Sequence, residues 1–345
     1  MNSDRPHGSG SVALRWGALL LIAALAPAAA LTTPDSGAAA RPLKHRPTKV
    51  CLVPGTGKPL DKIWHPHLFS AIGYNDMRTG DIAFAVRTDH HLYSYRPDHQ
   101  EWSASMVKAM LLVTYLDLPR VRGRPLSGAE KSVLGPMITE SDNNDAQQIF
   151  DTVGQGGLRA LADRVGMSHF ATSPIWGATG VTARDLTKFF LHVDSYIARL
   201  HRGYAMRLLR SIVPSERWGI GEVAPKGWRL YFKGGWGYGT GLIDSQVALL
   251  VRGCARVSIA VLTMYDGSHA YGKETLHGIF ARLVRGLPTG KRHHRHRRHG
   301  HPVAASTAHS RGRGTADGVG SLNATGSRHG RPLDPVSSDE RAAGP

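Results

Sequence analysis

The sequence predicts an α+β fold in which helices flank an antiparallel sheet and an all-helical subdomain is inserted into it. Three observations lead to this class. Two short strand-like runs come first, a long helical block follows, and three further strand-like runs precede a last helix. Because short turns join neighbouring strands, we expect them to pair antiparallel, with the helical block separating the two parts of one sheet. The sequence contains no internal repeat.

The first part of the sheet is expected as a hairpin over residues 81–89 and 90–98, which read DIAFAVRTD and HHLYSYRPD. An apolar helix then begins near Ser105. The helical segments that follow it are 127–138, 141–153, 157–167 and 182–200. Two of them begin with a serine or threonine that an acidic residue follows three positions later, the spacing of a capping box: Ser127 with Glu130, and Thr182 with Asp185. The late strands are 227–236, 245–254 and 256–265, and the last helix is 271–287.

The N-terminal part of the chain differs from this folded middle, which we place at residues 60–287. Residues 1–30 combine arginines, an apolar run and Ala-x-Ala spacing at Ala28 and Ala30, the layout of a secretory signal peptide. A membrane anchor is the alternative, but the run is shorter than the roughly 20 residues that a span needs. Residues 31–59 predict a linker. We therefore expect a secreted or envelope-associated protein.

The C-terminal part, residues 288–345, predicts a disordered tail because it has no aromatic residue and no apolar periodicity. Its KRHHRHRRHGH cluster adds to a formal net charge of +17. Metal binding by these histidines is one interpretation, and contact with anionic polymers of the cell envelope is the one that we favour. Nucleic acid is not an expected partner for two reasons. Export would separate the protein from nucleic acid inside the cell, and the domain lacks a basic helix with interleaved aromatic residues.

The only cysteines are Cys51 and Cys254, and neither lies in a CxxC or metal-type spacing. Export makes a disulfide chemically possible. Two separate thiols are the alternative. We expect the disulfide, because exposed free thiols are a liability outside the cell.

The segment SASMVK places Ser105 three residues before Lys108, which on a helix puts both side chains on one face. The free N–H groups of a helix N-terminus favour an oxyanion nearby. Apolar surroundings lower the pKa of a lysine, so that its amine can accept the serine proton. A lysine that extends from a core helix to solvent is the alternative.

The segment SDN follows at Ser141, Asp142 and Asn143. A serine hydroxyl there can relay a proton to a leaving group, and an asparagine amide can bind a substrate carbonyl. A helix N-cap is the alternative interpretation, because Ser, Asp and Asn are favoured cap residues.

The segment YFKGGW ends a strand with Lys233, Gly234, Gly235 and Trp236. Glycines in a strand allow another backbone to approach closely, as a substrate would. The N–H of Trp236 would then form an oxyanion hole with that of Ser105. An exposed lysine at a strand end is the alternative.

In this order, the three segments resemble the SxxK, SDN and KTG signature of the class A β-lactamase and penicillin-binding serine hydrolase superfamily. The resemblance covers about residues 60–285 and implies a three-layer α/β/α arrangement. RWGIGEVAPKGW, at 217–228, is similar to exported actinobacterial members. By this resemblance, Ser105 is the acylated nucleophile, Lys108 its proton acceptor and Ser141 a proton shuttle. Asn143 holds the substrate side chain, and Lys233 orients a carboxylate.

Three departures from this family pattern bear on activity. A class A β-lactamase has a general-base glutamate on a loop after the second motif, but residues 154–182 hold one acid, Asp163, in a predicted helix. Glu140 adjoins the second motif, with nothing to indicate that it faces the site. Gly234 replaces the motif's threonine, and Asp244 stands where a carboxylate-binding arginine is expected. The sequence therefore predicts an acyl-enzyme that persists.

We expect a monomeric serine hydrolase that acts on β-lactams or related amides and needs neither a cofactor nor a metal ion. A D,D-peptidase-like enzyme acting on peptidoglycan-like peptides is the first alternative. The second is a protein of the same fold that binds the cell wall without catalysis. Survival of all five polar motif positions favours the enzyme, whereas the missing loop acid and arginine favour the non-catalytic protein.

Overall fold

A five-stranded antiparallel sheet organises residues 50–237 and 241–289, the parts of the chain that this computed structural model describes. Its strands are β1 (Asp81–Arg87), β2 (Leu92–Tyr95), β5 (Arg229–Trp236), β6 (Asp244–Arg252) and β7 (Ala255–Met264). Their order is β2-β1-β7-β6-β5, so β1 joins the early hairpin to the late strands. This confirms the prediction of one sheet interrupted by a helical insertion.

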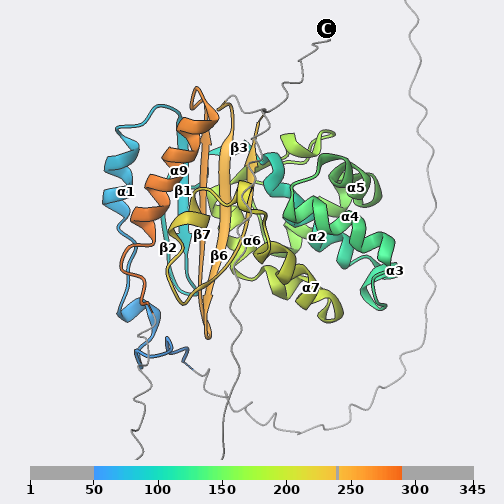
Figure 1. The fold of residues 1–345 in the computed structure, drawn as a ribbon, viewed down its shortest axis with the longest axis horizontal. Coiled ribbons are helices and arrows are strands. Elements are labelled where there is room, and N and C mark those ends of the chain that lie inside the picture. Colours follow the sequence, from blue (N-terminus) through green and yellow to red (C-terminus); the bar gives the residue numbers. More distant parts are fainter. Residues whose placement is uncertain (1–49, 238–240, 290–345) are drawn as a thin grey trace, which may run out of the picture. The chain divides into compact units, whose positions relative to one another are not determined.

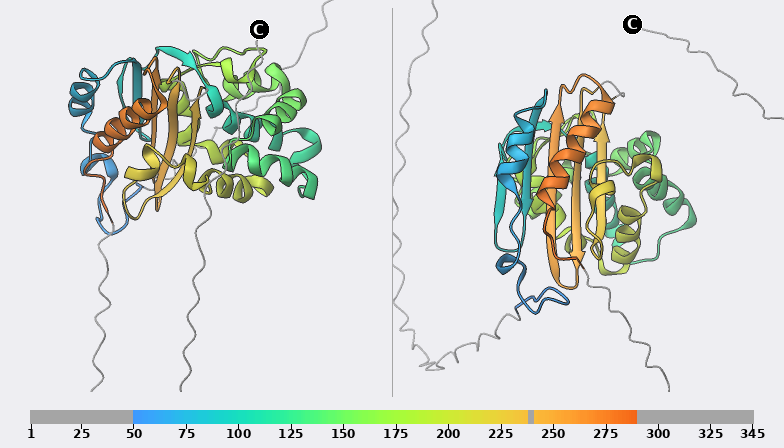
Figure 2. Two further views of the ribbon diagram at one scale, coloured as in Figure 1. Left: turned by 45° about the horizontal axis from the view of Figure 1, so that its top comes forward. Right: turned by 60° about the vertical axis from the view of Figure 1, so that its left-hand side comes forward.

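Helices cover both faces of the sheet. On one face lie α1 (Leu68–Asn75), α8 (Ile220–Val223) and α9 (His269–Leu283), and on the other lies α6 (Ala183–Leu191). Figures 1 and 2 show the sheet between these two layers. The arrangement confirms the three-layer α/β/α fold. Both faces of β7 are therefore covered, and nine of its ten residues are buried.

The helical subdomain lies between β2 and β5 in the chain. Its helices are α2 (Lys108–Leu116), α3 (Pro119–Arg122), α4 (Gly128–Thr139), α5 (Asn143–Val165) and α7 (Arg199–Arg210). Ser127 and Glu130 form the predicted capping box of α4. Gly154, at φ +62°, kinks α5, so the two helices predicted on either side of it are joined end to end.

Short 3₁₀ turns connect these elements. They are η1 (Leu60–Lys62), η2 (Ala104–Val107), η3 (Trp176–Ala178), η4 (Val193–Tyr196) and η5 (Pro214–Glu216). A second, two-stranded sheet pairs β3 (Gln100–Trp102) with β4 (Gly180–Thr182). Strands of three residues are too short for a periodic signal, which explains why the sequence did not predict them. This sheet holds the chain immediately before Ser105.

The helix predicted over 182–200 is shorter in the structure, and the reason is a tertiary contact. The threonine cap is present, since Thr182 accepts a hydrogen bond from the N–H of Asp185 (3.2 Å). However, α6 ends at Leu191, whose carbonyl accepts a hydrogen bond from Arg256 of β7 (2.6 Å). Arg256 also pairs with Asp194 at 2.5 Å in the following turn. A partner 62 residues away leaves no trace in local periodicity.

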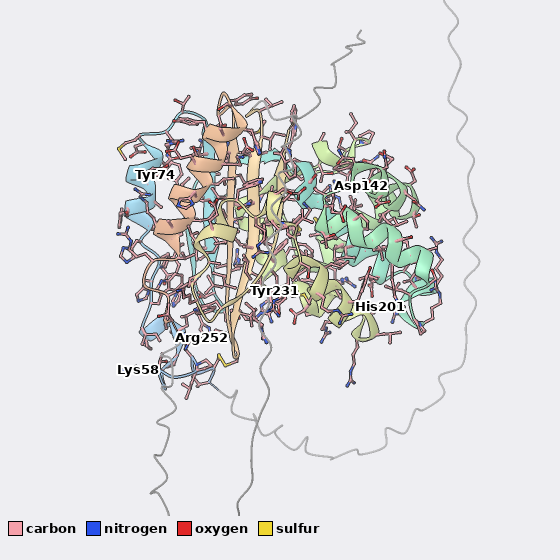
Figure 3. All side chains as sticks on the ribbon, viewed as in Figure 1. Lys58, Tyr74, Asp142, His201, Tyr231 and Arg252 are labelled. Carbon is pink, nitrogen blue, oxygen red and sulfur yellow. A yellow bond between two sulfur atoms is a disulfide. The ribbon has the colours of Figure 1, made fainter. Side chains whose placement is uncertain are left out.

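Cys51 and Cys254 form the expected disulfide, with Cα atoms 5.8 Å apart. Residues 50–59, from the range predicted as a linker, lie against the sheet: Val53 belongs to the core, and Arg252 donates to the carbonyl of Pro54 (2.8 Å). Figure 3 labels Arg252 at this end of the domain. The predicted signal peptide and most of the predicted tail lie outside the described residues. No helix within those residues is long and apolar enough to cross a membrane.

Candidate active site

The candidate nucleophile lies in the 3₁₀ turn that leads into α2. Ser105 is 8% exposed, and its neighbour Ala104 has φ +41°, a strained value for a residue with a Cβ atom. The turn is held from behind, because the N–H of Ser103 donates to the carbonyl of Thr179 (2.8 Å). The Ser105 hydroxyl makes no hydrogen bond to any described residue. It is therefore available to a substrate.

Lys108 is fully buried rather than extended to solvent. Its Nζ donates to the backbone carbonyl of Ser141, lies 3.3 Å from Ser141 Oγ and donates to Asn143 Oδ1 at 2.7 Å. Burial, followed by the charge of Lys233, lowers the pKa of Lys108 to about 7. The Trp176 ring, 4.9 Å away, covers the ammonium. A neutral amine is thus accessible near neutral pH.

The second motif is both a helix cap and part of the site. Asp142 caps α5 by accepting from the N–H of Asp145 (2.8 Å), and Figure 3 labels it on the helical side of the domain. Ser141, with φ +59°, turns the chain between α4 and α5. This strained turn directs Ser141 and Asn143 to Lys108. The helix-cap interpretation is thus confirmed for Asp142. Ser141 and Asn143 contact Lys108, and their roles toward a substrate stay predictions.

The third motif places a second buried lysine on the same serine. Lys233 is fully buried on β5, and its Nζ donates to Ser141 Oγ and to the Gly234 carbonyl, each at 2.9 Å. Burial lowers the pKa of Lys233 to about 8, opposed by the charge of Glu216. The alternative of an exposed lysine at a strand end is wrong. Two amines of lowered pKa thus meet at one hydroxyl.

Gly235 allows β5 to touch the nucleophile's turn. A Cβ atom on this residue would lie 2.8 Å from the Ser105 nitrogen and 2.9 Å from the Ser103 carbonyl oxygen, closer than packing permits. At Gly234 the nearest atom, on Trp218, would lie 3.4 Å away. Close packing therefore requires glycine at position 235, whereas position 234 has room for a Cβ atom.

The register of β5 shows where the Trp236 backbone points. Gly237 donates to the Ile243 carbonyl of the neighbouring β6 at 3.0 Å, so hydrogen-bonded pairs fall on alternate residues, 235 and 237. Trp236 lies between them, and its N–H points away from β6. Because β5 ends the sheet order and touches Ser105, this N–H faces the side on which Ser105 lies. The orientation suits the predicted oxyanion hole.

Glu216 is a site residue that the sequence did not predict. It ends η5, its side chain is 11% exposed, and its Oε2 lies 3.8 Å from Lys233 Nζ without a hydrogen-bond partner among the described residues. Burial raises its pKa, while the charges of Lys233 and Lys108 oppose that rise. No motif or spacing marks Glu216, since it reaches the lysines only through the tertiary fold.

The acids considered from the sequence do not join this group. Asp163 is exposed on α5, and Glu140 is exposed at the end of α4. Asp244 is fully buried on β6, where His269 Nδ1 lies 2.5 Å from its Oδ1. Burial raises the pKa of Asp244 to about 7. Residues 166–182, which supply Trp176 to the site, contain no acid.

No protein-family model and no curated protein matches the sequence. Solved structures do match. A β-lactamase from Sphaerobacter thermophilus is 16% identical with a TM-score of 0.55, over 64% of this chain and 97% of that one. A class A β-lactamase from Mycobacterium abscessus is 14% identical with a TM-score of 0.54, over 64% and 98%. A β-lactamase from Burkholderia vietnamiensis is 13% identical with a TM-score of 0.54, over 64% of this chain and 96% of that one. The described domain therefore has the fold of the class A β-lactamases.

Proposed function

We propose that this protein is an exported serine hydrolase that forms an acyl-enzyme on Ser105 with β-lactams or related amides. The observation that carries the proposal is the convergence of two fully buried lysines, Lys108 and Lys233, on the Ser141 hydroxyl. Buried amines of lowered pKa are typical of catalytic sites rather than of cores. The fold shared with solved β-lactamases supports the substrate class.

Acylation would begin with Lys108. An amine whose pKa is about 7 is neutral in roughly half of the molecules at pH 7, so it can accept a proton at that pH. Ser105 Oγ forms a bond to the substrate carbonyl carbon while its proton passes to Lys108 Nζ. The carbonyl oxygen gains negative charge, which the N–H groups of Ser105 and Trp236 would stabilise.

Expulsion of the leaving nitrogen would use Ser141. As the carbon–nitrogen bond breaks, the nitrogen takes the hydroxyl proton of Ser141, and Lys108, 3.3 Å away, returns its proton to Ser141 Oγ. The charge of Lys233 favours this exchange and suits a substrate carboxylate. Asn143 uses its carbonyl oxygen on Lys108, which leaves its NH₂ group for a substrate carbonyl.

A D,D-peptidase-like enzyme with a long-lived acyl-enzyme is the second candidate, and one observation favours it. The loop that covers Lys108 supplies an indole ring, Trp176, and no carboxylate. Glu216 contacts Lys233 rather than that loop. A water molecule that attacks the ester therefore has no evident base within the described residues, and deacylation is expected to be slow.

Export is part of the proposal, and the disulfide between Cys51 and Cys254 supports it, because such bonds persist in oxidising compartments. An extracytoplasmic location would also bring the basic residues 288–345 to anionic envelope polymers, in agreement with the net charge of +17.

The test is the intact mass of the full-length protein over time after mixing with a reporter β-lactam. Ser105→Ala should remove the adduct, whereas Ser103→Ala, a buried serine two residues away, should retain it. An adduct that persists for hours supports the peptidase-like candidate. An adduct that disappears with turnover supports a β-lactamase with another deacylating group. The absence of any adduct on wild-type protein would overturn the enzyme proposal and leave a non-catalytic protein.

A further inference from the structure

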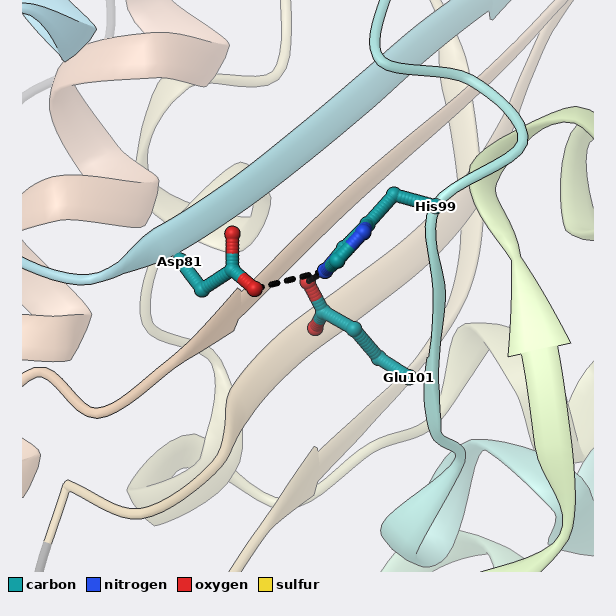
Figure 4. A group of neighbouring side chains, drawn as sticks. All are labelled: Asp81, His99 and Glu101. Carbon is teal, nitrogen blue, oxygen red and sulfur yellow. Dashed lines mark ion pairs between the residues drawn. The ribbon is translucent and has the colours of Figure 1, made fainter.

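A second cluster of ionisable side chains lies on the segment that precedes the nucleophile. Asp81 comes from β1, while His99 and Glu101 come from the entry to β3 and from β3 itself. Figure 4 shows the three side chains pointing toward one another. His99 Nε2 lies 2.6 Å from Asp81 Oδ2 and 3.8 Å from Glu101 Oε1. One donor atom from each residue falls within 4.8 Å of the other two.

Glu101 is the unusual member of this cluster. Its side chain is 1% exposed, and neither carboxylate oxygen has a hydrogen-bond partner among the described residues. Burial raises the pKa of Glu101 to about 8. A buried carboxylate without donors is strongly unfavourable, and the proteins that contain one usually satisfy it with an ion or a water molecule. The geometry thus leaves room for a positively charged partner.

A cavity leads from solvent to this cluster. The cavity, of about 330 Å³, is lined by Asp81, His99 and Glu101, together with residues that include Trp102 and Tyr265. Water or a small ion from solvent can therefore meet the side chains of Asp81 and His99, which are about one third exposed, beside the covered carboxylate of Glu101.

We propose that Asp81, His99 and Glu101 form a binding site for a divalent cation. One imidazole nitrogen and two carboxylate oxygens suit zinc, with a water molecule from the cavity as the fourth ligand. A tetrahedral zinc about 2.1 Å from each donor separates the donors by about 3.4 Å. The observed separations of 2.6 Å and 3.8 Å bracket this value. Small side-chain movements are sufficient to reach it.

Arg96 defines what must change on binding. Its guanidinium contacts Asp81 Oδ1, and its Nη2 lies 3.1 Å from His99 Nδ1. These contacts hold the outer atoms and leave Asp81 Oδ2 and His99 Nε2 facing Glu101. A zinc ion on Nε2 requires the imidazole proton on Nδ1, so Arg96 must withdraw from that atom. Its side chain is 40% exposed, so water can solvate the guanidinium once it leaves His99.

The site would connect the sheet to the nucleophile's segment. β1 belongs to the large sheet, and Glu101 stands four residues before Ser105 in β3. An ion shared by both would fix β3 against β1 and reduce movement of the turn that carries Ser105. This inference does not depend on the proposed hydrolase activity, since it concerns stability and ion binding alone.

The test is thermal unfolding of the full-length protein, first freed of metal with a chelator and then titrated with zinc chloride. At a zinc concentration a hundred times Kd, the Tm should rise by about 5–10 °C. His99→Gln and Glu101→Gln should abolish the rise. His277→Gln is the matched control, because His277 is exposed and pairs with a single carboxylate, Glu222, at 2.8 Å. All variants keep the histidine-rich residues 291–301. Zinc that binds to those residues therefore affects every variant equally and cannot cause a difference in Tm between them.

A rise in Tm that is equal in wild type, His99→Gln and Glu101→Gln would overturn the proposal, as would the absence of a rise in wild type. If the buried change at Glu101 prevents folding, His99→Gln at the half-buried side chain carries the comparison. Cobalt(II) gives a second readout, because its visible spectrum reports coordination geometry. A spectrum lost in His99→Gln and kept in His277→Gln supports the site. Identical spectra in all variants would assign binding to the tail and overturn it.

Discussion

Two clusters of ionisable side chains meet residues 101–108, one at Lys108 and the other at Glu101, and they differ in how the fold satisfies their buried members. At one end, the ammonium groups of Lys108 and Lys233 both have oxygen acceptors, and Ser141 Oγ lies within 3.3 Å of each. At the other end, the carboxylate of Glu101 has no donor among the described residues. Burial moves the pKa values of all three toward neutrality, but only the lysines are positioned by the protein's own hydrogen bonds. The fold therefore satisfies the buried amines of the first cluster, whereas the second contains a buried carboxylate without a partner among the described residues, for which we have proposed a cation.

The largest expected effect comes from removing the base of the first cluster. Lys108→Met retains the bulk of the side chain but leaves no amine to accept the Ser105 proton. Acylation by a reporter β-lactam should slow by about 10²–10⁴-fold, the usual contribution of a general base. Stopped-flow measurement of adduct formation gives the rate. Lys131→Met, at an exposed lysine on α4, is the control and should leave it unchanged. A loss of less than tenfold in Lys108→Met would assign the proton to another group.

The next effect tests how closely β5 must approach the nucleophile's turn. Gly235→Ala places a methyl group 2.8 Å from the Ser105 nitrogen and should lower the free energy of unfolding by about 1–3 kcal/mol. Acylation should slow with it, because the turn is displaced. Gly234→Ala is the matched control, with 3.4 Å to its nearest neighbour, and should have less effect on both quantities. Urea unfolding and adduct formation measure them. Equal losses of stability and of acylation rate in Gly235→Ala and Gly234→Ala would contradict the close approach of β5 to the turn that carries Ser105.

The charge of Glu216 should appear in the pH dependence of acylation. The reaction requires neutral Lys108 and charged Lys233, so its rate should rise with pH through about 7 and fall through about 8. The carboxylate of Glu216 raises both pKa values, so Glu216→Gln should move both limbs to lower pH, by about one pH unit or about 1.4 kcal/mol.

Glu222→Gln is the control for this shift, because it removes the same charge from an exposed side chain that pairs with His277. Its profile should coincide with that of wild type. Limbs that stay in place in Glu216→Gln, or that move to higher pH, would show that Glu216 does not act on the lysines through its charge.

The smallest effect concerns the unsatisfied carboxylate itself. In the presence of chelator, Glu101→Gln replaces a buried group that can carry charge with a neutral amide, which is less unfavourable without partners. The free energy of unfolding should rise by about 1 kcal/mol. Chemical denaturation with chelator measures it, with Glu222→Gln as the exposed control. A loss of stability with chelator would mean that Glu101 already has a partner and would remove the contrast between the two clusters.

The sequence predicted the cluster around Lys108 better than the cluster around Glu101, because the residues of the first lie in short, recognisable motifs. Three segments predicted the site residues Ser105, Lys108, Ser141, Asn143 and Lys233. In the structure the last four share hydrogen bonds and β5 touches the backbone of Ser105, while their catalytic roles stay predictions. Glu216 was missed, since the search for an acid followed the loop at 154–182, whereas the acid near the lysines lies beyond α7. Glu101 was missed as well, because nothing local marks a glutamate as buried.

By itself, the sequence predicted one antiparallel sheet with a helical insertion and the capping box of α4, and it favoured a disulfide between Cys51 and Cys254. Periodicity, cap chemistry and residue type are local properties, and two cysteines allow only one intramolecular pairing. Only the tertiary structure decided which charges share a site. Packing brought Glu216 to Lys233 across 17 residues and Asp81 to Glu101 across 20, and it buried the side chains of Lys108, Lys233 and Glu101. Burial sets the pKa values there, and burial is a property of the assembled fold.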